Sequence, residues 1–392
     1  MNETIINELS KNLNISINSI KNTLELLEVG NTIPFIARYR KEVTGNLDET
    51  VIRAIETEYS YQINLEKRKE EIKRLIDEKG LLTEDLIIKI NAAGKLVEIE
   101  DIYRPFKEKK KTKATEAINN GLEPFAKIIM SFNVSGSINE VARKYLNDKV
   151  TSVEDAITGA KYIIAEWISD NAYYRKQIRY LTYLNGILTS KKKTKAEDEL
   201  KTYEMYYDFK ENVKNIKLYR VLAINRGESE DILNVSIDID ESIILDFLNS
   251  KVIKNNDNLE LFNIVLDAIK DGYKRLIKPS IEREIRSELK DKAEDVAIDN
   301  FSDNLEKLLM QPPLREKVIL GFDPAYRTGC KLAVIDKTGK PLKISVIYPH
   351  EPKNEYEKSK QIILDLINKY NIDVIAIGNG TASRESESFI AD

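Results

Sequence analysis

Basic side chains beside an aromatic ring are the residues of this sequence whose spacing points most directly to chemistry. Segment 31–46 places three cations within four positions next to Tyr39: Arg38, Arg40 and Lys41. Such a cluster can hold the phosphates of a nucleic acid while the ring stacks on a base. The spacing also suits a helix face whose arginines pair with carboxylates such as Glu42, and spacing alone favours this second interpretation.

A second basic run lies in segment 104–113, which carries six cations and a single anion. Because the run holds too few carboxylates to pair with its cations, we predict that it is exposed to solvent. It is then either a loop that follows nucleic-acid phosphates or a solvated loop without a ligand. The candidate nucleic-acid-binding residues of this run are Arg104, Lys107, Lys109, Lys110, Lys111 and Lys113.

One carboxylate, Asp323, ends a predicted buried strand in the motif Gly-Phe-Asp-Pro. Cleavage of a phosphodiester by two Mg²⁺ ions needs several carboxylates that converge on ions about 4 Å apart. Asp336, Glu385 and Glu387 are weaker candidates for the other ligands. In the alternative interpretation Asp323 caps the turn before the proline. No catalytic or metal-ligating residue is therefore assigned, no cofactor is predicted, and Mg²⁺ enters only if the chain is a nuclease.

The composition excludes several classes of site. Among the 392 residues there is one cysteine, Cys330, and one histidine, His350. A disulfide within the chain needs two cysteines, and a structural zinc site needs about four Cys or His ligands, so both are excluded. The formal net charge of −4 means that anion binding depends on local patches. The N-terminus lacks a signal-peptide pattern and no long apolar stretch occurs, so we expect a cytoplasmic protein without a membrane segment.

Helical periodicity dominates the chain up to the Gln-Pro-Pro motif that starts at Gln311. Apolar residues recur at helical spacing over 5–27 and again over 156–183. Asp48 is the predicted N-cap of a long helix, and Thr83 is the predicted N-cap of a shorter one. These patterns predict a mostly α N-terminal region.

Two segments depart from this pattern. In 219–239, β-branched residues flank an Asn-Arg-Gly-Glu turn, which predicts a small β-hairpin. After residue 316 the order becomes three strands, a helix, a strand and a second helix. Three meandering strands followed by a helix and a parallel strand are typical of the opening of a ribonuclease-H-like fold. The predicted fold class is therefore multidomain, with a small β excursion in the helical region and then a partial α/β ribonuclease-H-like domain.

Several stretches, taken in order, resemble the Tex family of bacterial transcription accessory proteins. The resemblance runs along nearly all of the chain and is carried by 31–49, 100–117, 121–126, 222–230, 281–297, 321–336 and 375–387. It implies a Tex-type helical domain (1–190), a helical connecting region that contains the hairpin (191–316) and a YqgF-type ribonuclease-H-like domain (317–392). A glycine that is frequent in the family after Asp-Pro is Ala325 here, which leaves that turn less free.

The resemblance implies an RNA-binding transcription accessory factor that is not catalytic, because the YqgF-type domain of this family lacks an intact nuclease site. Family members also carry helix-hairpin-helix repeats and a C-terminal RNA-binding barrel. We expect this chain to be a fragment that stops within its truncated α/β domain and lacks both. Two alternatives stay open: a metal-dependent nuclease of the resolvase type, and a scaffold that docks on RNA polymerase or the ribosome. The expected partners are RNA or DNA.

Overall fold

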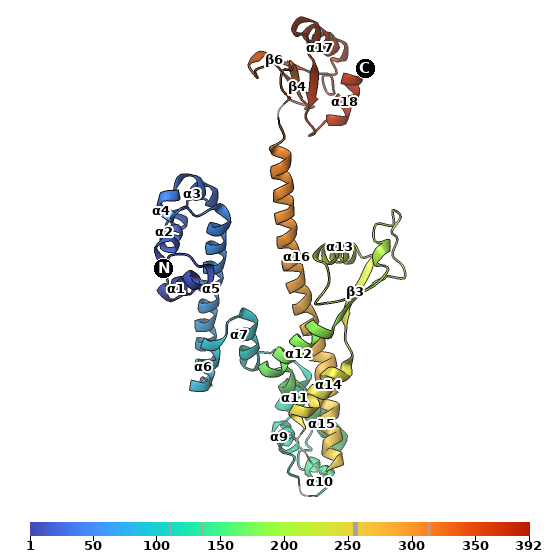
Figure 1. The fold of residues 1–392 in the computed structure, drawn as a ribbon. Helices are drawn as coiled ribbons and strands as arrows, with labels where there is room; N and C mark the ends of the chain where they lie inside the picture. Colours follow the sequence, from blue (N-terminus) through green and yellow to red (C-terminus); the bar gives the residue numbers. More distant parts are fainter. Residues whose placement is uncertain (110, 135, 254–257, 313) are drawn as a thin grey trace. The chain divides into compact units, whose positions relative to one another are not determined.

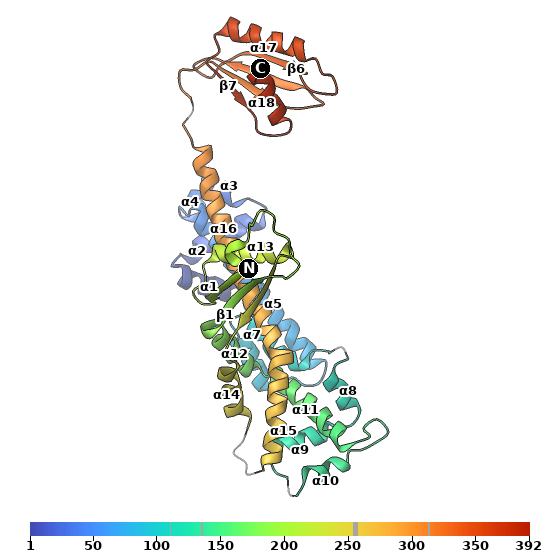
Figure 2. The ribbon, with the colours of Figure 1, turned by 90° about the vertical axis from the view of Figure 1, so that its right-hand side faces the viewer.

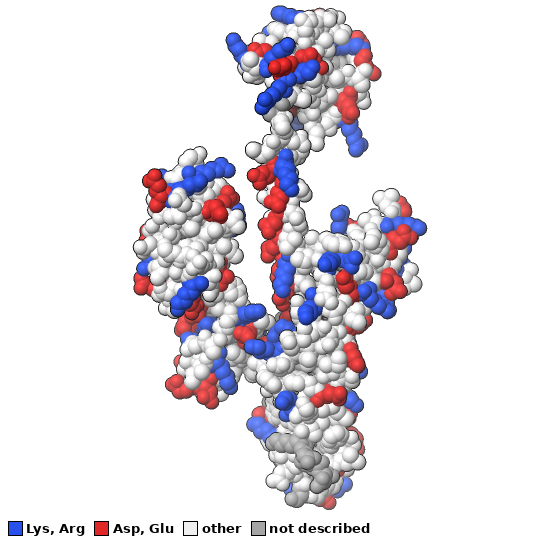
Figure 3. Space-filling view, viewed as in Figure 1, with Lys and Arg blue, Asp and Glu red and all other residues white. Residues whose placement is uncertain are grey.

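The computed structural model describes residues 1–109, 111–134, 136–253, 258–312 and 314–392 (Figure 1). Two compact units make up the chain, residues 1–298 and 299–392. Positive and negative side chains are interspersed over the face shown in Figure 3, and the formal net charge of the chain is only −4. None of the helices described is both long and apolar enough to cross a membrane.

The N-terminal part of the first unit is helical, as predicted. Its helices are α1 (Glu3–Leu13), α2 (Ile17–Glu28), α3 (Ile33–Tyr39), α4 (Lys41–Thr44), α5 (Glu49–Asp77), α6 (Glu84–Ala92) and α7 (Leu96–Tyr103). The two predicted N-caps are confirmed, because Asp48 accepts a hydrogen bond from the Val51 N–H and Thr83 accepts one from the Leu86 N–H. The apolar stretch 5–27 forms two helices, since the left-handed backbone of Asn14 ends α1.

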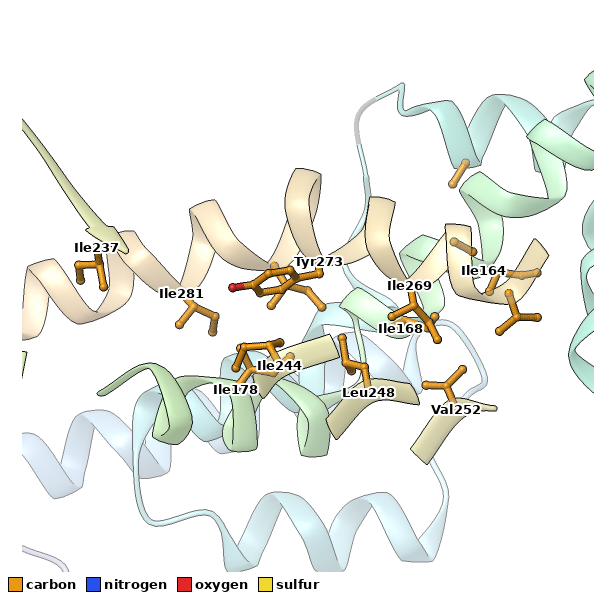
Figure 4. Packing of buried hydrophobic residues seen from close by; sticks show 14 of the residues in the cluster. Ile164, Ile168, Ile178, Ile237, Ile244, Leu248, Val252, Ile269, Tyr273 and Ile281 are labelled. Atoms are coloured by element: carbon orange, nitrogen blue, oxygen red, sulfur yellow. The ribbon is translucent and has the colours of Figure 1, made fainter. Parts of the chain in front are cut away.

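Helix α11 (Val153–Ser169) is the centre of the rest of this unit. It contacts α8 (Lys113–Asn119), α9 (Glu123–Ser131), α10 (Ile138–Arg143), α12 (Ala172–Asn185) and α15 (Leu259–Asp271). Helix α14 (Glu241–Val252) packs on α12 and α15, and α16 (Lys278–Leu309) follows them in the chain. Figure 4 shows Ile164 and Ile168 of α11 near Ile269 and Tyr273. A π-helical segment, Gly272–Ile277, joins α15 to α16, and its glycine lets the chain approach the α11 backbone closely.

The β excursion is a three-stranded antiparallel sheet in the order β2-β1-β3, formed by β1 (Ile187–Lys192), β2 (Asp208–Asn212) and β3 (Leu233–Asp238). The hairpin predicted for 219–239 is wrong, because Leu218–Ser229 is helix α13 and only β3 is a strand. Val221 and Ile224 are buried three residues apart, which is helical spacing. The predicted turn glycine, Gly227, instead permits close packing: a Cβ there would lie 2.6 Å from Leu233 Cδ1.

The second unit contains a four-stranded mixed sheet in the order β6-β5-β4-β7, with β7 parallel to β4. Its elements are β4 (Ile319–Asp323), β5 (Cys330–Ile335), β6 (Pro341–Ile347), α17 (Tyr356–Tyr370), β7 (Val374–Ile377) and α18 (Ser383–Ala391). This confirms the predicted order of elements and the predicted fold class. Phe322 of the sheet packs with Ile363 of α17 and Phe389 of α18, while Ile344 on β6 is exposed. Figure 2 shows both helices against the sheet.

Candidate nucleic-acid interface

The predicted cations of segment 31–46 lie together where α3 ends and α4 begins. Ile33, Ile36 and Ala37 are buried against Ile52 of α5, so one side of α3 is fixed to the core. The backbone of Arg40 leaves the helical region between the two helices. As a result the three cations of this segment all stand in solvent: Arg38, Arg40 and Lys41. We call these residues, with Phe35 and Tyr39, the α3–α4 patch.

Two aromatic rings complete the α3–α4 patch. Tyr39 is 66% exposed, and its ring centroid lies 5.2 Å from that of Phe35. The Arg40 guanidinium lies 5.3 Å from the centre of the Phe35 ring, a cation–π distance. Among the residues that the structure describes, no ion pair is found for the three cations of the patch. The alternative interpretation, in which they pair with Glu42, is therefore wrong, and their charges are available to an external anion.

The structure divides the residues of the 104–113 run. Lys109 forms ion pairs with Asp170 and, at 3.3 Å, with Glu166, two carboxylates outside the run, so the prediction that the run is exposed to solvent is wrong for it. Burial, and then repulsion from Arg175, lower the pKa of the half-buried Arg104 guanidinium. Arg104 also donates to the Ser280 hydroxyl at 3.4 Å, so both cations are partly buried and contact other groups of the protein. Lys110 lies outside the described residues.

Three cations among the described residues of the run lie at the surface. Lys107 and Lys111 are exposed, and no ion pair is found for them within the described part of the chain. Lys113, the first residue of α8, donates a hydrogen bond to the Tyr162 hydroxyl at 3.3 Å and lies 4.7 Å from the centre of that ring. Its charge is still exposed. Among the described residues of this run, Lys107, Lys111 and Lys113 therefore stay candidates for contact with a nucleic acid, and Lys110 stays an untested prediction.

A buried ion cluster that the sequence did not predict lies beneath this run and joins α7, α12 and α16. The fully buried Arg175 donates to Asp101 Oδ1 at 2.6 Å and to Glu284 Oε1 at 2.5 Å. Arg179 donates to the same two carboxylates, at 2.8 Å and 2.6 Å. Although burial acts to raise it, the pKa of Glu284 is held below its ordinary value by these two arginines. Arg175 shares a buried helix face with Ile178, and an arginine at helical spacing from apolar residues was the signal in the sequence that could have indicated a buried ion pair.

The carboxylates proposed for metal binding do not converge. Asp323 ends β4 as predicted, but its side chain is 70% exposed and its Oδ2 lies 3.8 Å from Lys331 Nζ. Asp336 accepts hydrogen bonds from the Thr338 hydroxyl and backbone, so it stabilises its own turn. A hydrogen bond to Glu385 raises the pKa of Tyr326. Across the described ranges no group of three His, Cys, Asp or Glu side chains could hold a metal ion, so these residues do not fit a two-metal site.

Three domain families match this chain in succession. Residues 3–77 match the Tex-like protein N-terminal domain, residues 134–301 match the Tex central region-like domain, and residues 317–392 match the Tex protein YqgF-like domain. The order helical region, small sheet and mixed α/β sheet is thus that of a multidomain Tex-type protein. The chain belongs to the Tex family.

Relatives along the whole chain agree with this assignment. The chain is 48% identical over 388 residues to the uncharacterized protein YdcI of Bacillus subtilis, with 98% of this chain and 54% of YdcI covered. It is 34% identical to the protein tex of Bordetella pertussis (99% and 51% covered) and 30% identical to the human S1 RNA-binding domain-containing protein 1 (100% and 40% covered). The chain therefore spans about half the length of these two bacterial relatives.

Proposed function

We propose that this chain is a nucleic-acid-binding part of a transcription accessory factor that acts in the cytoplasm, and that the α3–α4 patch contacts the nucleic acid. One observation carries the proposal: next to the exposed Tyr39 stand three exposed cations, for which the described part of the chain holds no ion pair. Cations can bind successive phosphates while a ring stacks on a base, and neither contact depends on base sequence. The names of two relatives, a transcriptional accessory protein and an S1 RNA-binding domain protein, support the same class of function.

We propose further that this function is not catalytic. The support is the surroundings of Asp323: its Oδ2 lies 3.8 Å from the ammonium of Lys331, and it belongs to no group of three possible metal ligands within the described ranges. A cation at 3.8 Å opposes a divalent metal at the same carboxylate. A nuclease would require Mg²⁺-dependent cleavage that Asp323→Asn abolishes, so cleavage assays on RNA, single-stranded DNA and branched DNA test this part.

Binding of labelled RNA and DNA strands by the chain, measured by fluorescence anisotropy, tests the main proposal. The test variant neutralises the patch cations as Arg38→Gln, Arg40→Gln and Lys41→Gln. A matched control removes three exposed cations of α5 in the same unit: Arg53→Gln, Lys67→Gln and Arg74→Gln. The patch variant should bind about tenfold more weakly or worse, because charge-assisted contacts are lost, while the control changes little. Equal affinity of the two variants would refute the assignment of the patch.

Docking on RNA polymerase or the ribosome is the alternative use of the same exposed cations. A protein contact and a nucleic-acid contact respond differently to nuclease. Copurification of either assembly with the chain, unchanged after nuclease treatment and lost in the patch variant, would favour docking over direct binding of nucleic acid.

A further inference from the structure

Helices α13 and α16 enclose a groove that the α3–α4 patch does not involve. The two helices lie side by side in both ribbon views (Figures 1 and 2), and between them is a groove of about 510 Å³. Its walls come from segments 222–230 and 281–297, two of the stretches that carry the family resemblance. Because 218–229 is a helix and not a hairpin, Asn225 and Glu228 lie on the side of it that faces α16, where both accept hydrogen bonds from Arg286.

Cations outnumber carboxylates in this groove, which we call the α13–α16 groove. Four cations line it against two carboxylates, Glu228 and Glu294: these cations are Arg226, Arg283, Arg286 and Lys290. The hydroxyls of Ser229 and Ser287 and the amide of Asn225 add neutral hydrogen-bond donors. Figure 3 shows Lys and Arg side chains together with Asp and Glu side chains at the level where the two helices meet.

The ion pairs within the groove leave part of this positive charge free. Arg286 holds Glu228 through both guanidinium Nη atoms, with Nη1 3.1 Å from Oε1, so this pair is fixed and nearly neutral. Lys290 and Glu294 are 3.6 Å apart and both about half exposed, which makes them a weak surface pair. Arg226 forms a second surface pair, with its Nε 3.0 Å from Oε1 of Glu230 on the same helix. For Arg283 no ion pair is found in the described ranges. Arg283 and Lys290 can therefore turn towards a ligand at little cost.

The spacing of the cations identifies the ligand chemistry. Arg283 and Lys290 are seven residues apart on α16, which places them on the same face and about 10.5 Å apart along the helix. Arg226 faces them from α13. Arginine and lysine in such a row suit an anion with more than one charged group, and phosphate oxygens match both the charge and the donor geometry. We propose that the α13–α16 groove binds a phosphate-bearing ligand.

Two sources could supply these phosphates: a free nucleoside triphosphate, or the backbone of a single strand. The volume of the groove suits a ligand of nucleotide size. Its open row of cations equally suits successive backbone phosphates. The groove shares no residue with the α3–α4 patch, so variants of the two sites test the groove inference and the proposed function independently.

The experiment uses the full chain and the double variant Arg283→Gln/Lys290→Gln. Its matched control, Lys292→Gln/Lys307→Gln, removes two exposed cations of the same helix that do not line the groove. ATP binding is measured by isothermal titration calorimetry, and binding of a short labelled RNA strand by anisotropy as a function of salt. Circular dichroism of both variants shows that the helices are retained.

We expect the groove variant to bind at least one of the two probes about tenfold more weakly, with the control unchanged. Loss confined to ATP identifies a nucleotide site. Loss confined to the strand, with the salt slope reduced by about 1.4 for two phosphates, identifies a backbone contact. Binding of both probes that is equal in the groove variant and its control would overturn the inference, as would absence of any binding by the unaltered chain. If only the patch variant loses RNA binding, the inference fails and the proposed function stands.

Discussion

Replacing Arg175 with methionine tests how strongly the buried ion cluster joins α7, α12 and α16. The side chain is fully buried and donates to Asp101, Glu284 and Ser280, the last at 2.9 Å. Methionine fills a similar volume but leaves Arg179 as the arginine that still donates hydrogen bonds to both carboxylates. Breaking a buried ion pair in this way costs about 3–5 kcal/mol.

The lower end of that range is expected, because the half-buried Arg104 also interacts electrostatically with Asp101 and Glu284. We therefore predict a loss of about 3 kcal/mol in the free energy of unfolding. Denaturation followed by the fluorescence of Trp167, the only tryptophan, reports on this unit. The control Arg53→Met breaks an exposed pair with Glu49 and should cost less than about 0.5 kcal/mol. A loss below about 1 kcal/mol for the buried variant, with an unchanged m-value, would refute the reasoning.

Three further changes have defined outcomes. Two arginines hold the pKa of Glu284 below its ordinary value, so the ionised Glu284 stabilises the protein at neutral pH and this stabilisation is lost as pH falls below about 4.3. Unfolding midpoints measured at falling pH should therefore decline less steeply in Glu284→Gln than in the unaltered chain. Asp170 is buried, and burial raises its pKa; Lys109→Met removes the cation that pairs with it. Calorimetry of this variant should therefore show a loss of about 1–3 kcal/mol in the free energy of unfolding. Gly227→Ala should cost about 1–3 kcal/mol by urea denaturation, because its Cβ meets Leu233; an unchanged midpoint would contradict the close packing.

Local signals in the sequence were sufficient for much of the fold. Asp48 and Thr83 cap their helices through side-chain bonds to N–H groups three residues away, an interaction that a short segment specifies by itself. The order of elements in the second unit followed from changes of hydrophobic period between turns. The position of Asp323 at the end of β4 was predicted for the same reason.

Interactions between distant segments could not be predicted in this way. Segment 219–239 contains short apolar runs that fit both a strand and a helix, and packing of Gly227 against Leu233 decides for a helix. Lys109 pairs with a carboxylate 61 residues away, which nothing in its own basic run indicates. The α3–α4 patch was predicted as a cluster of cations, but whether these pair internally depends on how α3 packs on α5. The groove between α13 and α16 exists because 218–229 is a helix, which its local sequence did not indicate.

The salt dependence of RNA binding tests the central claim most directly. If the α3–α4 patch contacts three phosphates, the slope of log K against log salt for a single strand should become shallower by about 2 when Arg38, Arg40 and Lys41 are replaced by glutamine. The control variant of α5 should keep the slope of the unaltered chain. A patch variant that binds with the same slope and the same affinity as that control would contradict the account.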